Sequence, residues 1–348
     1  MIMKKAEYWH RCEDGRAQCD LCPHGCVIAE GKSGICRVRG AVGGELKALG
    51  YGLVSSAGLD PIEKKPLYHF FPGAEIFSMG GWGCNLGCSF CQNWTISQQF
   101  EQGREAYTAE WIVKKAAATG SIGIAYTYNE PIVGFEFVRD CSRLARQAGL
   151  LNVLVTNGYV RKEPASELIP LVDAMNIDIK SMDDAFYRKH CGATLQPVLD
   201  FARQAVQAGV HVEITNLVIP GLNDDDCHVE LLARWMRANL GETVPLHLSA
   251  YHPQYKLEVM PTPPSSLQRA HAIARKSLLY VYMGNVTMRL GQDTDCPGCG
   301  RLLVERRGYA TAIKGIDHDR CAGCGRKADV RLKKPASSSL PGGSPTSR

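Results

Sequence analysis

Three cysteines stand close together in the stretch GCNLGCSFCQN, at Cys84, Cys88 and Cys91. A structural zinc site or a complete ferredoxin cluster uses four thiolates, because zinc is tetrahedral and each iron of a cubane takes its own terminal ligand. Three thiolates leave one corner of the metal centre open to a substrate or cofactor. The spacing therefore indicates a cluster with an open position, and the alternative is a zinc site that takes a distant fourth ligand.

A second group of cysteines lies near the start of the chain, at Cys19, Cys22, Cys26 and Cys36. Four thiolates in so short a stretch, separated by glycines that let the backbone wrap a metal, favour ligation over free thiols. Zinc and an auxiliary [4Fe-4S] cluster both accept four cysteines, and the thiolates alone do not choose between them. Cys12 or His24 could replace any member of the set.

A third group consists of two CxxCG knuckles about twenty residues apart, which contain Cys296, Cys299, Cys321 and Cys324. Such pairs are typical of a zinc ribbon. The sequence between them predicts a β-hairpin with strands at 302–304 and 310–313. Because this site is fully ligated, we expect its metal to be structural.

The totals agree with a folded protein in a reducing compartment. The chain has 348 residues, 45% of them hydrophobic, and a net charge of +5, so no nucleic-acid or membrane surface is required. Its 15 cysteines are odd in number and mostly in close spacing, which favours metal ligation and a cytoplasmic location over disulfides. We also expect neither a membrane span nor a signal peptide.

Between about 76 and 290, short β-rich runs alternate with amphipathic helical stretches. The pattern predicts helices at 108–120, 132–149, 196–209 and 225–240, and strands at 75–80, 122–128, 152–157, 174–180, 210–219 and 245–251. Repeated βα units imply parallel strands, either in an open doubly wound sheet or in a partial (β/α)6 barrel of the TIM type.

Polar residues follow these strands, and in parallel folds the chemistry sits at the carboxyl ends. We therefore expect one face to gather Cys84, Asn129, Glu130, Thr156, Asn157, Lys180 and His252. Asp178 and Lys180 share one side of their strand by the period of two, which would point them into the barrel. The alternative for these two is a structural ion pair.

The CxxxCxxC loop, with Phe90 before its last cysteine, resembles the cluster loop of the radical S-adenosylmethionine (SAM) enzymes. The resemblance implies that Cys84, Cys88 and Cys91 hold three irons of a [4Fe-4S] cluster and that the fourth iron chelates SAM. It also implies reductive cleavage of SAM, with an electron donor such as flavodoxin or ferredoxin. Phe90 would shield the cluster or pack near the adenine.

Further motifs resemble the activating enzymes of glycyl-radical enzymes, such as the pyruvate formate-lyase activating enzyme. TYNEP at 127–131 stands where those enzymes carry Gly-Gly-Glu-Pro, which implies cofactor contacts from Asn129 and Glu130. VTNGY, NIDIKSMDD and AYHP resemble other segments of these enzymes and extend the cofactor-contacting set to Asn157, Asp178, Lys180 and His252, with Lys180 meeting the cofactor carboxylate. The alternative for Glu130 is a helix N-terminal residue, and for His252 a plain structural one.

A broader resemblance links DPIEKKPLYHFFPG at 60–73, CQN at 91–93 and the flanking cysteines to the radical SAM enzyme of the AmmeMemoRadiSam system. It covers about residues 5 to 330. Lys64 and Lys65 would lie either in a solvated loop or on a docking surface.

The chain thus divides into a cysteine-rich segment (1–75), a radical SAM partial barrel (76–290), a zinc-ribbon-like module (291–333) and a Ser-, Pro- and Gly-rich tail (334–348) that is expected to be disordered. The resemblance implies hydrogen abstraction, with a glycine in a partner protein as one target and a small molecule as another. The competing interpretation is a metal-scaffolded binding, assembly or redox-sensing protein that does not cleave SAM.

Overall fold

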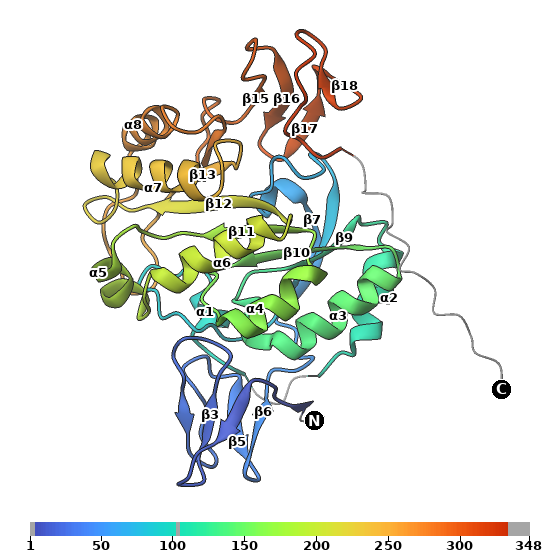
Figure 1. Cartoon of the computed structure of the whole chain (residues 1–348), viewed down its shortest axis with the longest axis vertical. Coiled ribbons are helices and arrows are strands. Elements are labelled where there is room, and N and C mark those ends of the chain that lie inside the picture. Colours follow the sequence, from blue (N-terminus) through green and yellow to red (C-terminus); the bar gives the residue numbers. More distant parts are fainter. Residues whose placement is uncertain (1–3, 102–104, 333–348) are drawn as a thin grey trace, which may run out of the picture.

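The structure is a computed structural model that describes residues 4–101 and 105–332. Its centre is an eight-stranded sheet whose order follows the chain (Figure 1). The strands are β7 (Ser56–Pro61), β8 (Glu75–Gly80), β9 (Gly123–Tyr126), β10 (Leu151–Thr156), β11 (Ala174–Asp178), β12 (His211–Val218), β13 (Leu246–Ala250) and β14 (Val281–Gly284). Neighbours from β8 to β14 are parallel, and β7 pairs antiparallel with β8.

The six predicted strands are confirmed as β8 to β13, and they are parallel as expected. The sequence did not indicate β7 and β14, which form the two edges. Among the described strands no pairing joins β14 to β7. The central sheet is therefore mostly parallel, and closure into a barrel is not observed.

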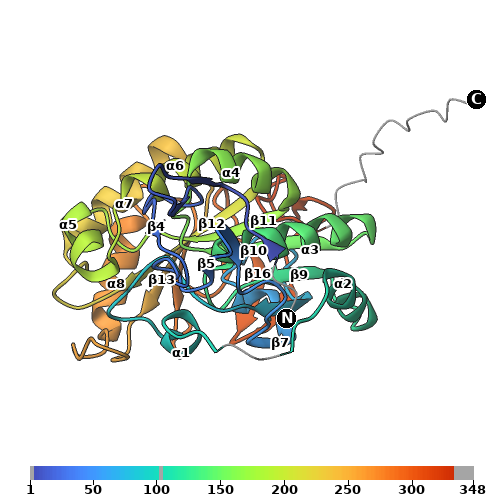
Figure 2. The ribbon, with the colours of Figure 1, turned by 90° about the horizontal axis from the view of Figure 1, so that it is seen from below.

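Helices cover the outer face of the sheet (Figure 2). The four predicted helices form, and α4 and α8 are additional; the set is α2 (Ala109–Ala118), α3 (Phe135–Gln147), α4 (Lys162–Leu168), α6 (Gln196–Gln207), α7 (Asp226–Asn239) and α8 (Pro264–Ala274). Side-chain caps begin two of them, because Thr108 accepts a hydrogen bond from Trp111 N–H and Asp225 accepts one from His228 N–H. The apolar core lies between these helices and the sheet.

The N-terminal cysteine-rich segment forms two small antiparallel sheets (Figure 1). One contains β1 (Lys4–Lys5), β6 (Glu45–Ala48) and β5 (Arg39–Val42), and the other contains β2 (Trp9–Arg11), β3 (Ala17–Cys19) and β4 (Val27–Ile28). Arg161, which follows β10, donates its backbone N–H to Leu21 O at 3.1 Å. This segment, called the N-terminal module below (residues 4–54), therefore stands at the carboxyl ends of the parallel strands.

The C-terminal module (residues 293–332) lies at the opposite end of the sheet (Figure 1). It contains β15 (Thr294–Asp295), β16 (Leu302–Arg307), β17 (Ala310–Ile313), β18 (Ile316–Asp317) and β19 (Arg320–Cys321). The predicted hairpin is confirmed, because β16 pairs antiparallel with β17. The predicted disordered tail at 334–348 lies outside the described residues.

Buried polar groups fill the amino end of the sheet. The Glu213 carboxylate on β12 accepts the backbone N–H groups of Tyr68 at 2.9 Å and His69 at 2.7 Å, and it contacts His247 Nε2 at 2.6 Å. The Arg306 guanidinium of the C-terminal module lies 4.2 Å from the Tyr68 ring centroid and donates to Tyr68 O at 2.6 Å. The chain before β8 and the C-terminal module thus close this end together.

None of the helices within residues 4–101 and 105–332 has the length and apolar content of a membrane span.

Candidate functional site

The cluster loop, residues 81–93, connects β8 to the short helix α1 (Trp94–Ser97). Gly83 has φ +80°, and a Cβ atom there would stand 2.3 Å from Cys36 O, so this position accepts only glycine. Leu86 N–H donates to Cys84 Sγ at 3.3 Å, and Cys91 N–H donates to Cys88 O at 3.2 Å. The tight loop keeps all three predicted cluster ligands at the carboxyl end of β8.

The three thiols fit an iron–sulfur cluster by their spacing. Among the described residues, only one group of three or more potential ligands has its atoms all within 4.8 Å of one another, and Cys84, Cys88 and Cys91 do not belong to it. A single ion draws its ligand atoms together, whereas a cubane presents a different iron to each thiolate. The three thiols are therefore not arranged around one ion, and their role as ligands of a cluster stays a prediction.

A fourth cysteine, Cys191, stands beside this loop. It ends a single π-helical turn, η4 (Tyr187–Cys191), and its carbonyl accepts Gly87 N–H at 2.8 Å while His190 O accepts Ser89 N–H at 2.9 Å. These two bonds flank Cys88. Cys191 is isolated from the other cysteines in the sequence, and the sequence analysis gave it no role. The signal that could have placed it near the cluster loop is its position in the segment that follows β11 and Lys180.

Glu130 is buried and fully engaged in local hydrogen bonds. Its carboxylate accepts Ile132 N–H at 3.0 Å, Thr156 Oγ1–H at 2.7 Å and Asn157 N–H at 2.7 Å. Burial raises the pKa of Glu130 to about 7, although these hydrogen bonds oppose the rise. The side chain caps η2 (Pro131–Gly134) and joins the ends of β9 and β10, so the helix N-terminal role is present; its contact with a cofactor stays a prediction.

Asn129 fastens the start of the cluster loop. Its Oδ1 accepts Gly81 N–H at 2.9 Å, and its Nδ2 donates to Trp82 O and Gly83 O, each at 3.0 Å. Asn129 therefore positions the loop through its side chain, and a cofactor contact from its backbone stays a prediction.

Tyr128 adopts the left-handed backbone conformation that glycine usually supplies, with φ +73°. This residue stands where the resembling motif has glycine. Its hydroxyl hydrogen-bonds to Asp60, and the Lys65 ammonium lies 4.5 Å from its ring centroid. Such strained conformations persist only where the surroundings fix them. Asp60 and Lys65 supply that support from a segment far away in the sequence.

The structure corrects the interpretation of Lys65. Its side chain is 1% exposed and pairs with Asp60 at 2.7 Å, so it lies neither in a solvated loop nor on a docking surface. Lys64 also pairs with Asp60, at 2.8 Å, but its side chain is 44% exposed. The two adjacent lysines therefore differ in environment although the sequence gives them the same context.

Asn157 links the end of β10 to the cluster loop. Its Nδ2 donates to Asn85 Oδ1 at 2.9 Å and approaches Cys84 Sγ at 3.5 Å, and its Oδ1 accepts Tyr159 N–H at 2.8 Å. Asn85, which the sequence analysis did not single out, also donates to Tyr159 O at 2.6 Å. The two asparagines tie the Cys84 region to the neighbouring strand.

Asp178 and Lys180 are paired, with Lys180 Nζ 3.2 Å from Asp178 Oδ2. Burial disfavours the charge on Lys180, but attraction to Asp178 and to the Cys88 and Cys191 sulfur atoms outweighs this and raises the pKa of Lys180 well above its usual value. Lys180 Nζ also lies 6.0 Å from the ring centroid of Phe90, which is buried against Phe186. A cationic group thus stands beside the cluster loop, as predicted, and the alternative ion pair is also present.

His252 follows β13 and is exposed. Within the described part of the chain no hydrogen bond or ion pair is recorded for it. Its predicted contact with a cofactor therefore stays a prediction, while Cys84, Cys88, Glu130, Asn157 and Lys180 are brought together by the contacts above.

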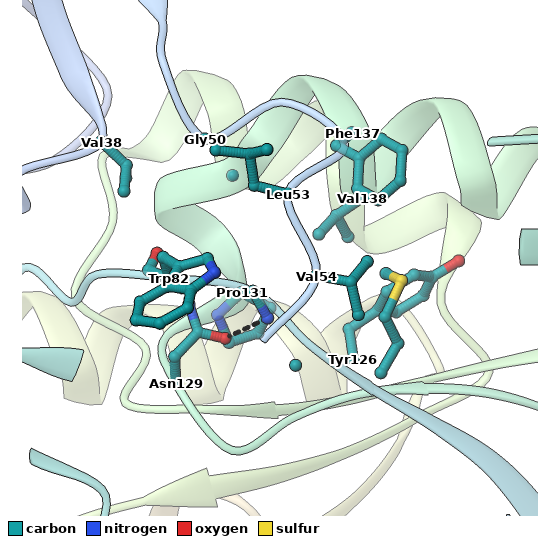
Figure 3. A pocket seen from close by; sticks show the side chains of 14 residues that line it. Val38, Gly50, Leu53, Val54, Trp82, Tyr126, Asn129, Pro131, Phe137 and Val138 are labelled. Atoms are coloured by element: carbon teal, nitrogen blue, oxygen red, sulfur yellow. Dashed lines mark hydrogen bonds between the residues drawn. The ribbon is translucent and has the colours of Figure 1, made fainter. Parts of the chain in front are cut away.

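A well-formed apolar pocket lies beside this region, not at it (Figure 3). Trp82 and Asn129 lie on one side of it, and Phe137 of α3 lies on the other. The cysteines of the cluster loop do not line this pocket. This pocket is therefore distinct from the predicted cluster ligands.

The four predicted N-terminal ligands converge on one small pocket, which Cys19, Cys22, Cys26 and Cys36 all line. His24 lines it too, but its Nε2 is engaged with Asn85 O at 2.7 Å. Cys12 is not among the lining residues, and its Sγ lies 3.9 Å from Gln18 Oε1. The cysteine set predicted from spacing is thus brought together as a set.

The four C-terminal cysteines form a compact group. Their sulfur atoms all lie within 4.8 Å of one another, with Cys296 and Cys324 3.6 Å apart and Cys299 and Cys321 also 3.6 Å apart. A tetrahedral zinc ion with Zn–S bonds of about 2.3 Å needs sulfur atoms roughly 3.8 Å apart. The arrangement fits a single tetrahedral ion.

Comparison with known proteins agrees with this geometry. The family model of the radical SAM superfamily matches residues 81–233, which begin at the cluster loop. An uncharacterized protein of Methanocaldococcus jannaschii is 45% identical over 337 residues, which is 95% of this chain and 100% of that protein. Pyruvate formate-lyase 1-activating enzyme of Escherichia coli K12 is 29% identical over 215 residues, 55% of this chain and 85% of that enzyme.

Among solved structures, a domain of a pyruvate-formate lyase-activating enzyme from Bacteroides vulgatus has a TM-score of 0.42 and 24% identity, and the match covers 47% of this chain and 99% of that domain. A likeness at this level carries no argument about function. The family match shows that residues 81–233 form a radical SAM domain, and the curated relatives show similarity to the activating enzymes of glycyl-radical enzymes.

Proposed function

We propose that this protein cleaves SAM reductively at a [4Fe-4S] cluster held by Cys84, Cys88 and Cys91. When bound there, the cluster supplies the electron that splits SAM into methionine and a 5′-deoxyadenosyl radical, which abstracts hydrogen from the substrate. The observation that carries the proposal is the placement of a three-cysteine loop, within the matched family region, beside a paired lysine at the carboxyl ends of parallel strands.

The chain's own residues bind and orient the reactants. Lys180, held as a cation by its surroundings, is placed to meet the carboxylate of the methionine moiety. Glu130 and Asn157 fix the ends of β9 and β10 relative to the loop, so the backbone of residues 127–130 can present itself to the amino group. Phe90 covers the side of the loop next to Lys180 and excludes water there.

The similarity to activating enzymes supports a partner protein as substrate, with a glycine as the hydrogen donor, and a low-potential electron donor such as flavodoxin or ferredoxin as the second partner. The stretch at 60–73 supports membership in the AmmeMemoRadiSam system. The M. jannaschii relative, which covers nearly the whole chain, is uncharacterized. Neither this relative nor the stretch at 60–73 therefore identifies the substrate.

The test is the release of 5′-deoxyadenosine. Anaerobically reconstituted protein given dithionite and SAM should release the nucleoside, and the variant with Cys84→Ala, Cys88→Ala and Cys91→Ala should release none. Cys227→Ala, which changes an exposed cysteine on α7, is the control and should keep full release. Absence of nucleoside from fully iron-loaded wild-type protein would support the metal-scaffolded binding or assembly role instead.

The substrate can then be traced by isotope. If a glycine of a partner protein is the target, deuterium placed on that glycine should appear in the released 5′-deoxyadenosine. Deuterium that stays in the partner, with nucleoside still released, would exclude that glycine and point to a different hydrogen donor.

A further inference from the structure

We propose that the N-terminal module holds a second [4Fe-4S] cluster, ligated by Cys19, Cys22, Cys26 and Cys36. The four cysteines line one pocket, whose other walls include Leu21, Ile28 and Val133. Four cysteine side chains that converge on one small apolar pocket favour a metal site over four separate buried thiols, because thiolates held together in this way are the ligands of zinc and of iron–sulfur clusters.

The spacing of the sulfur atoms selects the kind of metal centre. The C-terminal cysteines approach to 3.6 Å in pairs and all lie within 4.8 Å, as one zinc ion requires. Within the described residues, no three of the N-terminal cysteines meet the same limit, although all four line one pocket. In this respect they resemble Cys84, Cys88 and Cys91, and the difference from the C-terminal set favours a cluster over a single ion.

One of the residues that line this pocket also carries a buried donor without a partner within the described structure. Arg39 lines the pocket, and its side chain is 1% exposed. Its Nη1 pairs with Glu136 at 2.9 Å, but within the described structure its Nε is buried and has no hydrogen-bond partner. An inorganic sulfide or a cysteine sulfur of a cluster would accept this N–H, and hydrogen bonds to sulfur are a normal feature of such sites.

The pocket adjoins the cluster loop through both neighbours of Cys84. Cys36 O packs so closely against Gly83 that a Cβ atom there would stand 2.3 Å away, and His24 Nε2 lies 2.7 Å from Asn85 O. Two short connections thus join the N-terminal cysteines to the loop. A single electron from a low-potential donor can pass through the N-terminal cluster to the loop; this relay, unlike the cluster itself, rests on the proposed function.

Metal analysis of the variant with Cys84→Ala, Cys88→Ala and Cys91→Ala tests the cluster directly. After anaerobic reconstitution we expect about four irons per chain with the Mössbauer signature of [4Fe-4S] and one zinc, because only the loop site is removed. Two zinc ions and no iron, or no metal in the N-terminal site, would overturn the proposal. If this variant fails to fold, wild-type protein decides, with about eight irons expected against about four for a zinc-filled site.

Matched variants assign the ligands. Cys22→Ala with Cys26→Ala should remove about half of the iron and leave the loop cluster detectable by EPR. Cys12→Ala, in the same module but outside the pocket, should keep all of it. Equal iron in the double variant and the wild type would overturn the ligand assignment.

The electron relay is tested by EPR spectroscopy, separately from the existence of the second cluster. In fully reduced wild-type protein, EPR should show broadening or splitting from two neighbouring paramagnetic clusters, which is absent from both sets of variants. A wild-type spectrum equal to the sum of the variant spectra would overturn the relay and leave the second cluster in place. Nucleoside release by the wild type separately decides the proposed function.

Discussion

The two cysteine-rich modules contact opposite ends of one parallel sheet, and they are built differently. The C-terminal module brings its four sulfur atoms within 4.8 Å and reaches the sheet through the buried Arg306. The N-terminal module spreads its four cysteines around a pocket and contacts the cluster loop through His24 and Cys36. The same number of cysteines is thus gathered closely enough for one small ion at one end and is spread around a pocket at the other.

The number of residues between cysteines does not distinguish the two modules. Their positions in the fold and the distances between their sulfur atoms do. Both modules have four cysteines in CxxC-like patterns. The one beside the carboxyl ends of the strands contacts the cluster loop, where we propose redox chemistry, whereas the one at the amino ends packs against the sheet through Arg306. Perturbing each end separately should therefore give separable effects.

Removing the C-terminal metal should have the largest effect. In the variant Cys296→Ser with Cys299→Ser, the module should lose its zinc and unfold, because zinc binding supplies on the order of 10 kcal/mol of folding free energy in such modules. Zinc analysis should show one ion fewer per chain, and thermal unfolding should begin at lower temperature. Iron content should stay at the wild-type level; a parallel loss of iron would mean that the two ends are not separable.

The next largest effect is expected at Arg306. Arg306→Ala removes hydrogen bonds to Tyr68 O and Thr294 Oγ1 and the contact with the Tyr68 ring, all buried, and should lower the free energy of unfolding by about 3 kcal/mol. Its neighbour provides the control. Arg307 is exposed and pairs with Glu305 at 3.0 Å, so Arg307→Ala should change stability by less than about 1 kcal/mol. Similar losses in urea unfolding of both variants would contradict this account.

Acid should loosen the amino end of the sheet through His69. Burial lowers the pKa of His69 to about 4, and its ring nitrogens contact Asp329 O and the Tyr282 hydroxyl, each at 2.6 Å. The unfolded chain binds a proton near pH 6.5 while the folded chain does not, so stability is full above pH 6.5 and falls as the pH drops toward 4. The loss from this residue is at most about 3 kcal/mol.

Urea unfolding at pH 7 and at pH 4.5 checks this dependence. His69→Gln cannot take up a proton, so its stability should fall less between the two pH values than that of the wild type. An equal fall in both proteins would assign the acid sensitivity to other groups, such as Glu213.

The smallest effect is expected at the carboxyl end, at Lys65. Lys65→Met removes the partner of Asp60 and the cation over the Tyr128 ring, which loosens the strained turn at 127–130. We expect SAM binding to weaken up to about tenfold, or about 1.4 kcal/mol, with little change in stability. Lys64→Met, which changes the exposed partner of Asp60, should leave SAM affinity unchanged; equal weakening in both variants would contradict a special role for Lys65.

The central strands and the cysteine sets could be predicted because both follow local patterns. β8 to β13 are apolar runs bounded by helices, and the ligand spacings are short in sequence. β7 was missed because SAGLDP contains glycine and proline, which disfavour a strand. It gains its strand structure from pairing with a neighbour in the sheet.

The contacts of the site could be predicted less well, because they join distant parts of the chain. Glu130 was found from its motif, yet its partners Thr156 and Asn157 lie on the next strand. Cys191 approaches the cluster loop from about a hundred residues away, and its neighbours in sequence contain no ligand pattern. Local motifs identify the residues of the site. The tertiary fold determines which of their atoms form hydrogen bonds within the protein.

The packing of the Arg306 guanidinium against the rings of Tyr68 and Tyr282, which also contact each other, has a consequence for access to the protein's interior. With the amino end occupied by this guanidinium and by Glu213 with its partners, a reactant approaches the cluster loop from the carboxyl ends of the strands. The N-terminal module stands at that entrance. Its outer surface therefore helps to decide how large an incoming molecule can be and in which orientation it arrives.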